Sequence, residues 1–262
     1  MPTSSTVPSA VLSSGSRIIP EFLALEIAQR MAEKLEIVRL QPKKIGHLGA
    51  LNLSVLSAYY PDADHCCFDK RFSSNAVSQL FKKITRQHFY RYQEPTAIGT
   101  GDFDLIWSNL ELHLQSDPET LMKRWRSQLK PEGLLMFSYL GPDTGKELTK
   151  LFPNDCLLRN AGSLDMHDVG DGLMQAGFSE PVMDMEYLTL SYEDPHLMCK
   201  EAFNLGLLAD PDSAQHLIQT NSTLTITLEV VYGHAWAPNA LLSQKKAGIT
   251  TISPDQIVRS KK

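Results

Sequence analysis

The chain has 262 residues, of which 42% are hydrophobic and 21% are charged, a composition typical of a globular protein. Its net charge of -5 provides no basic surface for nucleic acid or anionic lipid, and the sequence lacks the run of about 18 apolar residues that a membrane span needs. We therefore expect a cytoplasmic protein that binds a small molecule or another protein, with no nucleic-acid partner.

The cysteines are expected to be reduced residues of the core. None belongs to a CxxC pair or stands at metal-ligand spacing from a histidine: Cys66, Cys67, Cys156 and Cys199. Cys66 and Cys67 lie in an apolar run that is typical of a buried strand. The sequence therefore predicts no metal site.

Composition divides the chain into three segments. Residues 1–19 are rich in Ser, Thr and Pro and predict a disordered tail, while residues 239–262 predict a polar C-terminal tail. Residues 20–238 between them predict one domain. This domain should begin with a helix from Pro20 to about Leu35, because apolar residues recur there at four-residue spacing.

After this helix, short apolar runs alternate with helical segments. Strands are predicted at residues 44–48, 64–68, 103–107 and 134–140. Between the last two, a helix should start near Asp117 and end at Pro131 and Gly133. This order of elements predicts a parallel sheet with helices on both faces.

The last third of the domain predicts a different arrangement. A helix is expected from Asp165 to Gly177, and helical segments from about His196 to Leu208. Strands are expected at residues 182–192 and 224–236. Two strands joined by a long excursion suit an antiparallel hairpin at one edge of the sheet.

Candidate binding residues follow the predicted strands, because ligands of open parallel sheets bind beyond the carboxyl ends of the strands. Asp69 stands twenty residues after Gly49, a spacing at which a carboxylate can accept hydrogen bonds from the hydroxyls of a ribose. An aspartate after an apolar run is also a common turn residue. The spacing alone leaves both interpretations open.

Six segments together carry a family resemblance. They are EIAQRMAEKL at 26–35, FDLIWSNL at 103–110, LKPEGLLMFS at 129–138, GPDT at 141–144, MHDVGD at 166–171 and YGHAW at 232–236. From Phe22 to Pro238 the chain resembles the malonyl-acyl-carrier-protein O-methyltransferases of biotin synthesis and their relatives among mitochondrial complex I assembly factors. The former are class I S-adenosylmethionine (SAM) methyltransferases.

The resemblance implies both a fold and a reaction. The fold is α/β and Rossmann-like, with a seven-stranded, mostly parallel sheet, an antiparallel edge hairpin and helices on both faces. The reaction is methyl transfer from SAM to the free carboxyl of a malonyl thioester on acyl carrier protein. A carboxylate is already ionised near neutral pH, so positioning and desolvation carry most of the rate and no catalytic base is expected.

The cofactor loop departs from the family's first motif. That motif reads approximately Asp-Leu-Gly-Cys-Gly-Thr-Gly and aligns with residues 47–53, where His47 replaces the acid and Gly49 is the one glycine kept. Leu51 and Leu53 would crowd the methionine part of SAM, because the missing glycines let the backbone approach it. We expect weakened or lost SAM binding.

The resemblance implies a set of site residues. The cofactor would contact His47, Gly49, Asp69, Ser108 and Asn109, and the substrate cleft would be flanked by Trp107 and His113. Local capping explains Ser108 and Asn109 equally well, and core packing explains Trp107. Architectural roles are expected for five further polar residues: Asp143, Thr144, His167, Asp168 and His234.

Three functions follow from these features. The first is a SAM methyltransferase-like protein with acyl carrier protein as partner. The second is a catalytically inactive protein that keeps the scaffold for binding or assembly with a protein partner. The third is a transferase for another cofactor or substrate, with Asp69 and residues 107–109 as its site.

Overall fold

The computed structural model describes residues 17–50, 53–67, 90–92, 100–157, 164–213 and 224–239. Asp69 and Leu51 fall outside these ranges, so their predicted roles stay predictions. The strands are β1 (Lys44–Gly49), β2 (Asp64–Cys67), β3 (Tyr90–Tyr92), β4 (Phe103–Asn109), β5 (Leu129–Leu140), β6 (Ser179–Tyr192) and β7 (Leu224–Trp236). The helices are α1 (Glu21–Leu35), α2 (Leu53–Tyr59), η3 (Leu112–Leu114), α4 (Pro118–Gln128), α5 (Lys146–Leu151), α6 (Met166–Gln175) and α7 (Pro195–Asn204).

The strands form one seven-stranded sheet in the order β3-β2-β1-β4-β5-β7-β6. Strands β1 to β5 pair in parallel, whereas β7 runs antiparallel to both β5 and β6. The predicted α/β fold, with a mostly parallel sheet and an antiparallel edge hairpin, is therefore confirmed.

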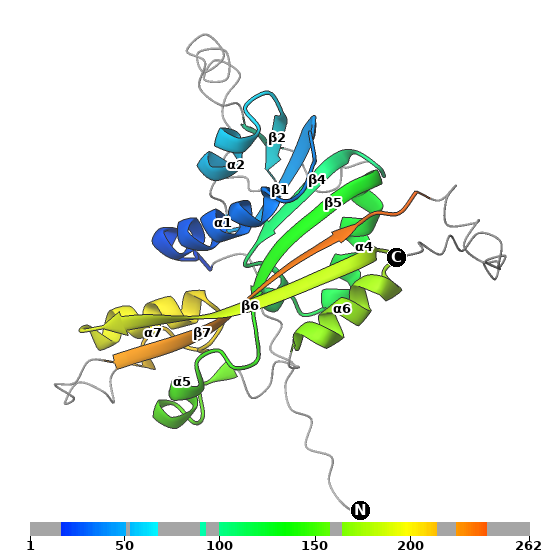
Figure 1. The fold of residues 1–262 in the computed structure, drawn as a ribbon. Coiled ribbons are helices and arrows are strands. Elements are labelled where there is room, and N and C mark those ends of the chain that lie inside the picture. Colours follow the sequence, from blue (N-terminus) through cyan, green and yellow to red (C-terminus); the bar gives the residue numbers. More distant parts are fainter. Residues whose placement is uncertain are drawn as a thin grey trace, which may run out of the picture.

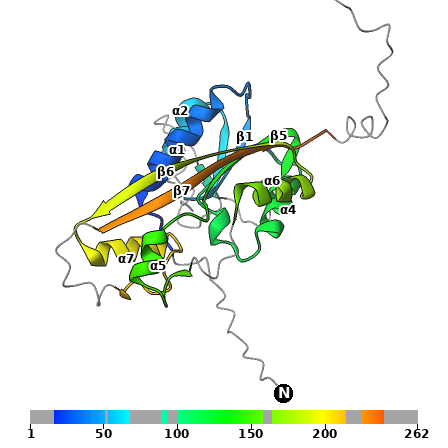
Figure 2. The same cartoon turned by 60° about the horizontal axis from the view of Figure 1, so that its bottom comes forward.

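Helices cover both faces of the sheet. Helices α1 and α2 lie on one face, and α4 and α6 lie on the other (Figures 1 and 2). Side chains of each strand alternate between the faces: in β5, Leu134 and Met136 join the cluster under α1, whereas Leu135 and Phe137 join the cluster under α4. Strand β5 is therefore apolar on both faces over these four residues.

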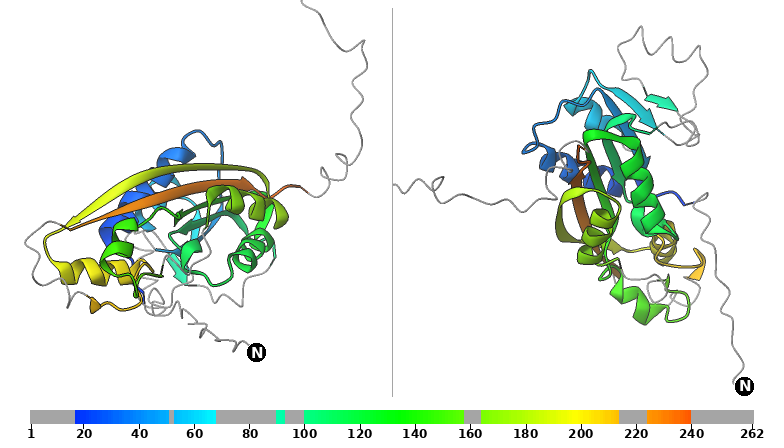
Figure 3. Two further views of the ribbon diagram at one scale, coloured as in Figure 1. Left: turned by 90° about the horizontal axis from the view of Figure 1, so that it is seen from below. Right: turned by 90° about the vertical axis from the view of Figure 1, so that its right-hand side faces the viewer.

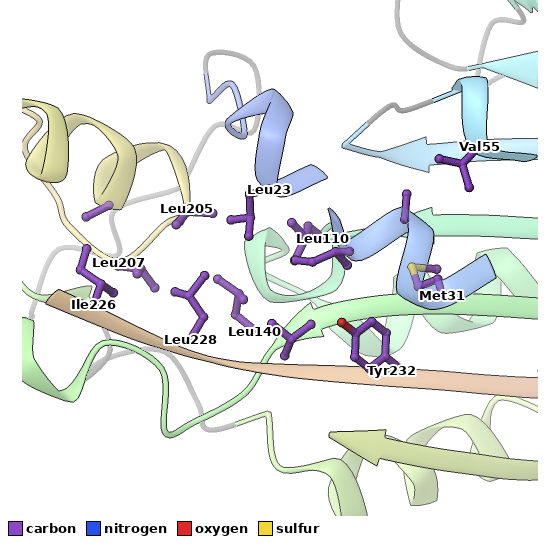
Figure 4. Packing of buried hydrophobic residues seen from close by; sticks show 14 of the residues in the cluster. Leu23, Met31, Val55, Leu110, Leu140, Leu205, Leu207, Ile226, Leu228 and Tyr232 are labelled. Carbon is purple, nitrogen blue, oxygen red and sulfur yellow. The ribbon is translucent and has the colours of Figure 1, made fainter. Parts of the chain in front are cut away.

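The edge hairpin is longer than the rest of the sheet. Its last pairing with β5 joins Leu140 and Val230, but β6 and β7 continue to the pair of Tyr192 and Leu224. Helices α5 and α7 lie beside this extension (Figure 3). Figure 4 shows its side chains, including Leu228, packed with Leu205 from the segment after α7. The extension and the central sheet therefore share one core.

The boundary between α4 and β5 differs from the sequence prediction. Helix α4 ends at Gln128, and β5 begins at Leu129, where Leu129 already pairs with Phe103. The helix end predicted at Pro131 and Gly133 falls inside the strand. Glu132 adopts a positive φ of 64° there, and its N–H donates to the Ala237 carbonyl. Tertiary pairing thus converts a predicted helix end into strand.

No described helix is long and apolar enough to cross a membrane. Among the same residues, no group of three or more His, Cys, Asp or Glu side chains could hold a metal ion. All four cysteines are buried.

Candidate site at the carboxyl ends of the strands

The carboxyl ends of β1, β4 and β5 meet at one edge of the sheet. Gly49 at the end of β1 is in register with Asn109 at the end of β4, and Ser108 is in register with Phe137 of β5. The sequence placed Ser108 and Asn109 just after their strand, but both belong to it. Of the residues predicted to bind the cofactor, those that the structure describes therefore lie close together at this edge.

Gly49 is required by the approach of β1 to β4. Its φ is 74°, a conformation that favours glycine, and a Cβ there would overlap the Asn109 carbonyl oxygen. The same oxygen accepts a hydrogen bond from the Ala50 N–H at 2.6 Å. The one glycine kept in the loop therefore has a structural role that needs no ligand.

Asn109 has two hydrogen-bond partners inside the protein. Its Nδ2 donates to the Ala24 carbonyl of α1 at 2.9 Å, and its Oδ1 accepts from the Ser138 hydroxyl of β5 at 2.9 Å. The residue is completely buried. Its side chain joins α1 to two strands, which leaves its predicted cofactor contact without support from these contacts.

Ser108 holds an acidic side chain that the sequence analysis did not single out. Its hydroxyl donates to Glu111 Oε2 at 2.9 Å, and Arg124 lies 3.8 Å from the other carboxylate oxygen. Burial raises the pKa of Glu111, while the Ser108 hydrogen bond and Arg124 oppose the increase. The signal for Glu111 was its position two residues after a strand end that carries candidates.

His47 is paired with a second histidine. Its Nε2 lies 2.9 Å from His65 Nδ1, and the rings stack with centroids 5.2 Å apart. His65 Nε2 lies 3.0 Å from the Tyr60 carbonyl, which can only accept, so His65 must carry its proton on Nε2 and His47 must donate from Nε2. This series of hydrogen bonds therefore fixes the tautomers of both rings.

The His47 ring is therefore neutral in the folded protein. Burial lowers the pKa of His47 to about 3, with a smaller contribution from His65. The acid of the family motif would carry a negative charge at this position. His47 provides no such charge.

The two predicted cleft residues differ in position. Trp107 is buried in the cluster under α1, as the packing interpretation described. His113 follows β4 in η3, and its Nδ1 accepts the Leu140 N–H at 3.3 Å. Its predicted contact with substrate stays a prediction.

The GPDT segment docks the end of β5 onto β7. Gly141 has no side chain, so the Glu229 carboxylate occupies the space where a Cβ would stand. That carboxylate accepts the Asp143 N–H at 2.6 Å, and the Glu229 N–H donates to the Thr144 hydroxyl at 3.0 Å. These contacts give Asp143 and Thr144 structural roles.

The segments MHDVGD at 166–171 and YGHAW at 232–236 also have structural contacts. Asp165 caps α6 by accepting the His167 N–H at 2.8 Å. Tyr232 donates to Glu186 at 2.6 Å, and Lys34 of α1 lies 4.9 Å from the centre of its ring. His234, two residues along β7, is in register with Val182 of β6. These contacts cap α6, join the two strands of the hairpin and hold the hairpin against α1.

Comparison with known proteins gives full-length relatives. The chain is 36% identical over 260 residues to the malonyl-acyl-carrier-protein O-methyltransferase of Gallionella capsiferriformans. This match covers 88% of this chain and 89% of the relative. It is 32% identical to malonyl-acyl-carrier-protein O-methyltransferase 1 of Coxiella burnetii, over 89% of this chain and 88% of that one. No family model matches the chain.

Solved structures share the fold at low sequence identity. The YcgJ protein of Bacillus subtilis superposes with a TM-score of 0.55 at 13% identity, over 82% of this chain and all of that one. A Bacillus halodurans protein described as a methyltransferase superposes with a TM-score of 0.53 at 13% identity, over 80% of this chain and 99% of that one. These likenesses concern the fold alone.

Proposed function

The chain belongs to the malonyl-acyl-carrier-protein O-methyltransferase family, and from this membership we propose that it acts on the carboxylate of an acyl group carried by acyl carrier protein, as a SAM-dependent methyltransferase. The observation that carries this proposal is similarity over almost the whole length, including the edge hairpin and the segments that dock it. A carboxylate acceptor is itself the nucleophile, so the lack of an assigned base does not weaken the proposal.

The described residues of the cofactor edge do not fit the family's way of holding SAM. A neutral imidazole that already donates to His65 replaces the motif's acid at His47. Both ends of the Asn109 amide are bonded within the protein. Losing a charge-assisted hydrogen bond typically costs about 1.5 to 3 kcal/mol, so these residues supply little of ordinary SAM affinity.

This misfit favours a second candidate, a family member that binds its acyl-carrier ligand without transferring a methyl group. The specific observation is that His47, Gly49 and Asn109 all have roles in the fold alone. Under this candidate the scaffold and the acceptor end of the site are kept, while the cofactor loop has diverged.

Calorimetric titration of SAM into the purified full chain tests the two candidates. A Leu51→Gly, Leu53→Gly double variant is titrated beside it, because these substitutions restore glycine where the family motif has it. Binding by the unmodified chain near micromolar affinity, followed by methylation of malonyl carrier protein, would support the methyltransferase.

The remaining outcomes separate the candidates. Binding by the double variant alone would support the non-catalytic member, because the loop would then be the one obstacle. Absence of binding by both proteins, with circular dichroism showing both folded, would contradict the methyltransferase. Substrate affinity would then be measured without SAM.

A further inference from the structure

Two buried nitrogen atoms without a hydrogen bond of good geometry lie close to the carboxyl ends of β4 and β5. They are a guanidinium nitrogen of Arg17 and Nε2 of His113. Buried polar groups without partners cost free energy, and a native structure keeps few of them. Their position at the ligand-binding edge of the fold points to a ligand rather than to chance.

Arg17 is held in place from three directions. The neighbouring Ile18 N–H donates to Asn204 Oδ1 at 3.2 Å, and the guanidinium carbon lies 4.9 Å from the centre of the Phe203 ring. One guanidinium nitrogen lies 2.9 Å from where a Cβ on Gly206 would stand, so the absence of a side chain there makes room for the cation. The sequence had assigned residue 17 to the disordered tail.

His113 presents an N–H to the same region. Its Nδ1 accepts the Leu140 N–H, so the neutral ring carries its proton on Nε2. Burial lowers the pKa of His113 to about 3; the Leu205 carbonyl opposes the decrease, and the charge of Arg17 adds to it. The ring is therefore a neutral donor near a cation.

The two side chains converge on the turn that follows α7. Leu205 faces the His113 ring and Gly206 faces Arg17, while Leu114, next to His113, also contacts Gly206. Figure 4 shows Leu205 packed in one cluster with Leu110, which follows β4, and Leu140, which ends β5. Segments far apart in sequence therefore build this corner.

This corner has the chemistry of an anion site. It combines a cation and a neutral N–H donor, and within the described part of the chain no carboxylate forms an ion pair with Arg17. We propose that Arg17 and His113 together bind the carboxylate of the malonyl group of the acyl-carrier substrate. The identity of the acyl group rests on the proposed function, whereas the anion preference rests on these two donors.

A carboxylate fits the pair because an arginine and a second N–H can each donate to one of its oxygens. Binding would give the Arg17 nitrogen a partner and neutralise the arginine, and the ligand would compete with the Leu205 backbone for the His113 N–H. The site does not require SAM, so it can operate in either candidate function.

Binding of two thioesters to the full chain tests the proposal. Malonyl-pantetheine and acetyl-pantetheine differ by the carboxylate, and we expect calorimetry to show at least about ten-fold tighter binding of the malonyl compound. Phosphopantetheine without an acyl group is titrated in parallel. If it bound as tightly as malonyl-pantetheine, the corner would be a phosphate site and the proposal would be overturned.

Two substitutions remove the Arg17 cation and the donor at the Nε2 position of His113 with little change of shape. Arg17→Met keeps an apolar chain over Phe203, and His113→Asn keeps an acceptor for the Leu140 N–H. Each should abolish most of the roughly ten-fold preference for the malonyl compound. Arg39→Met is the control, because it removes the same charge from an exposed residue that precedes β1 at the opposite end of the strands. An unchanged preference in both site variants would overturn the proposal.

A second measurement keeps the test valid if a variant folds poorly. In the unmodified chain, ¹⁵N spectra of the histidines should show the pKa of His113 rising when malonyl-pantetheine is added, because an anion stabilises the protonated ring. A merely structural His113 would show no such change. Malonyl-specific binding without methyl transfer would support this site and contradict the methyltransferase. Methyl transfer that is unaffected by Arg17→Met would support the methyltransferase and contradict this site.

Discussion

Gly49 illustrates how one residue can suggest a ligand and yet serve the fold. Its positive φ and its contact with the Asn109 carbonyl both exclude a side chain. A glycine in this loop is also what SAM binding would require. The sequence shows the residue, but only the structure shows which neighbour needs it.

Gly49→Ala should destabilise the protein by about 3 kcal/mol, because an L residue is strained at this φ and its Cβ would collide with backbone. Urea unfolding measures the loss. Gly170→Ala is the control. Gly170 lies within helix α6, and a Cβ there would meet only Met183, at 4.0 Å, so the substitution should stabilise the protein by up to about 1 kcal/mol. Equal effects at the two positions would contradict the packing role of Gly49.

The predictability of the site differs from residue to residue. The position of His47, Ser108 and Asn109 at one edge follows from strand order and could be predicted. Their partners could not, because His65, Glu111 and Ala24 reach them through tertiary packing that no local pattern encodes. For the same reason the sequence predicts that Arg17 belongs to a tail.

At the scale of elements, the His47–His65 pair joins β1 to β2. The chain of donors ends on the Tyr60 carbonyl, in the turn after α2. Both rings are buried, so the pair requires at least one histidine to stay neutral. Acidification should therefore weaken the contact between β1 and β2, because it protonates the pair.

His47 should make stability fall with acidity. Its folded pKa of about 3 is below the value of about 6.5 expected for the unfolded chain, so its contribution is complete above about pH 6.5 and is lost as pH falls towards 3. The slope that it adds is up to about 1.4 kcal/mol per pH unit.

His47→Gln keeps an N–H for His65 and should flatten the decrease in unfolding free energy from about pH 6 to about pH 4. Urea titrations at several pH values measure this slope. The matched substitution His167→Gln, at an exposed residue, should leave the slope unchanged. A slope unaffected by His47→Gln would show that the ring is not held neutral.

The sequence predicted the elements better than their ends. Apolar periodicity located α1, and the caps Asp117 and Asp165 located α4 and α6, because these signals are local. The start of β5 was missed because it depends on pairing with Phe103 and on Ala237. Such contacts between distant segments leave no mark in a short window of sequence.

At the scale of the whole molecule, one sheet serves two apolar clusters. Trp107 lies in the cluster under α1 and Trp125 in the cluster under α4. Because strand side chains alternate between the clusters, neither face can lose its packing without disturbing the strands that support the other. Unfolding should therefore be cooperative.

Two single-tryptophan variants test this cooperativity. One keeps Trp107 and the other keeps Trp125, with phenylalanine at the remaining tryptophan positions. Within each variant, fluorescence and far-ultraviolet circular dichroism should give the same urea midpoint, to within about 0.2 M. Separate midpoints in either variant would mean that one face unfolds independently of the other.

The close approach of β1 to β4 also bears on how this loop can change in a lineage. Selection for folding alone is sufficient to retain Gly49, since any side chain there would separate the two strands. A descendant that no longer bound SAM would therefore still keep this glycine. The glycine would then indicate how the strands pack and would say nothing about cofactor binding.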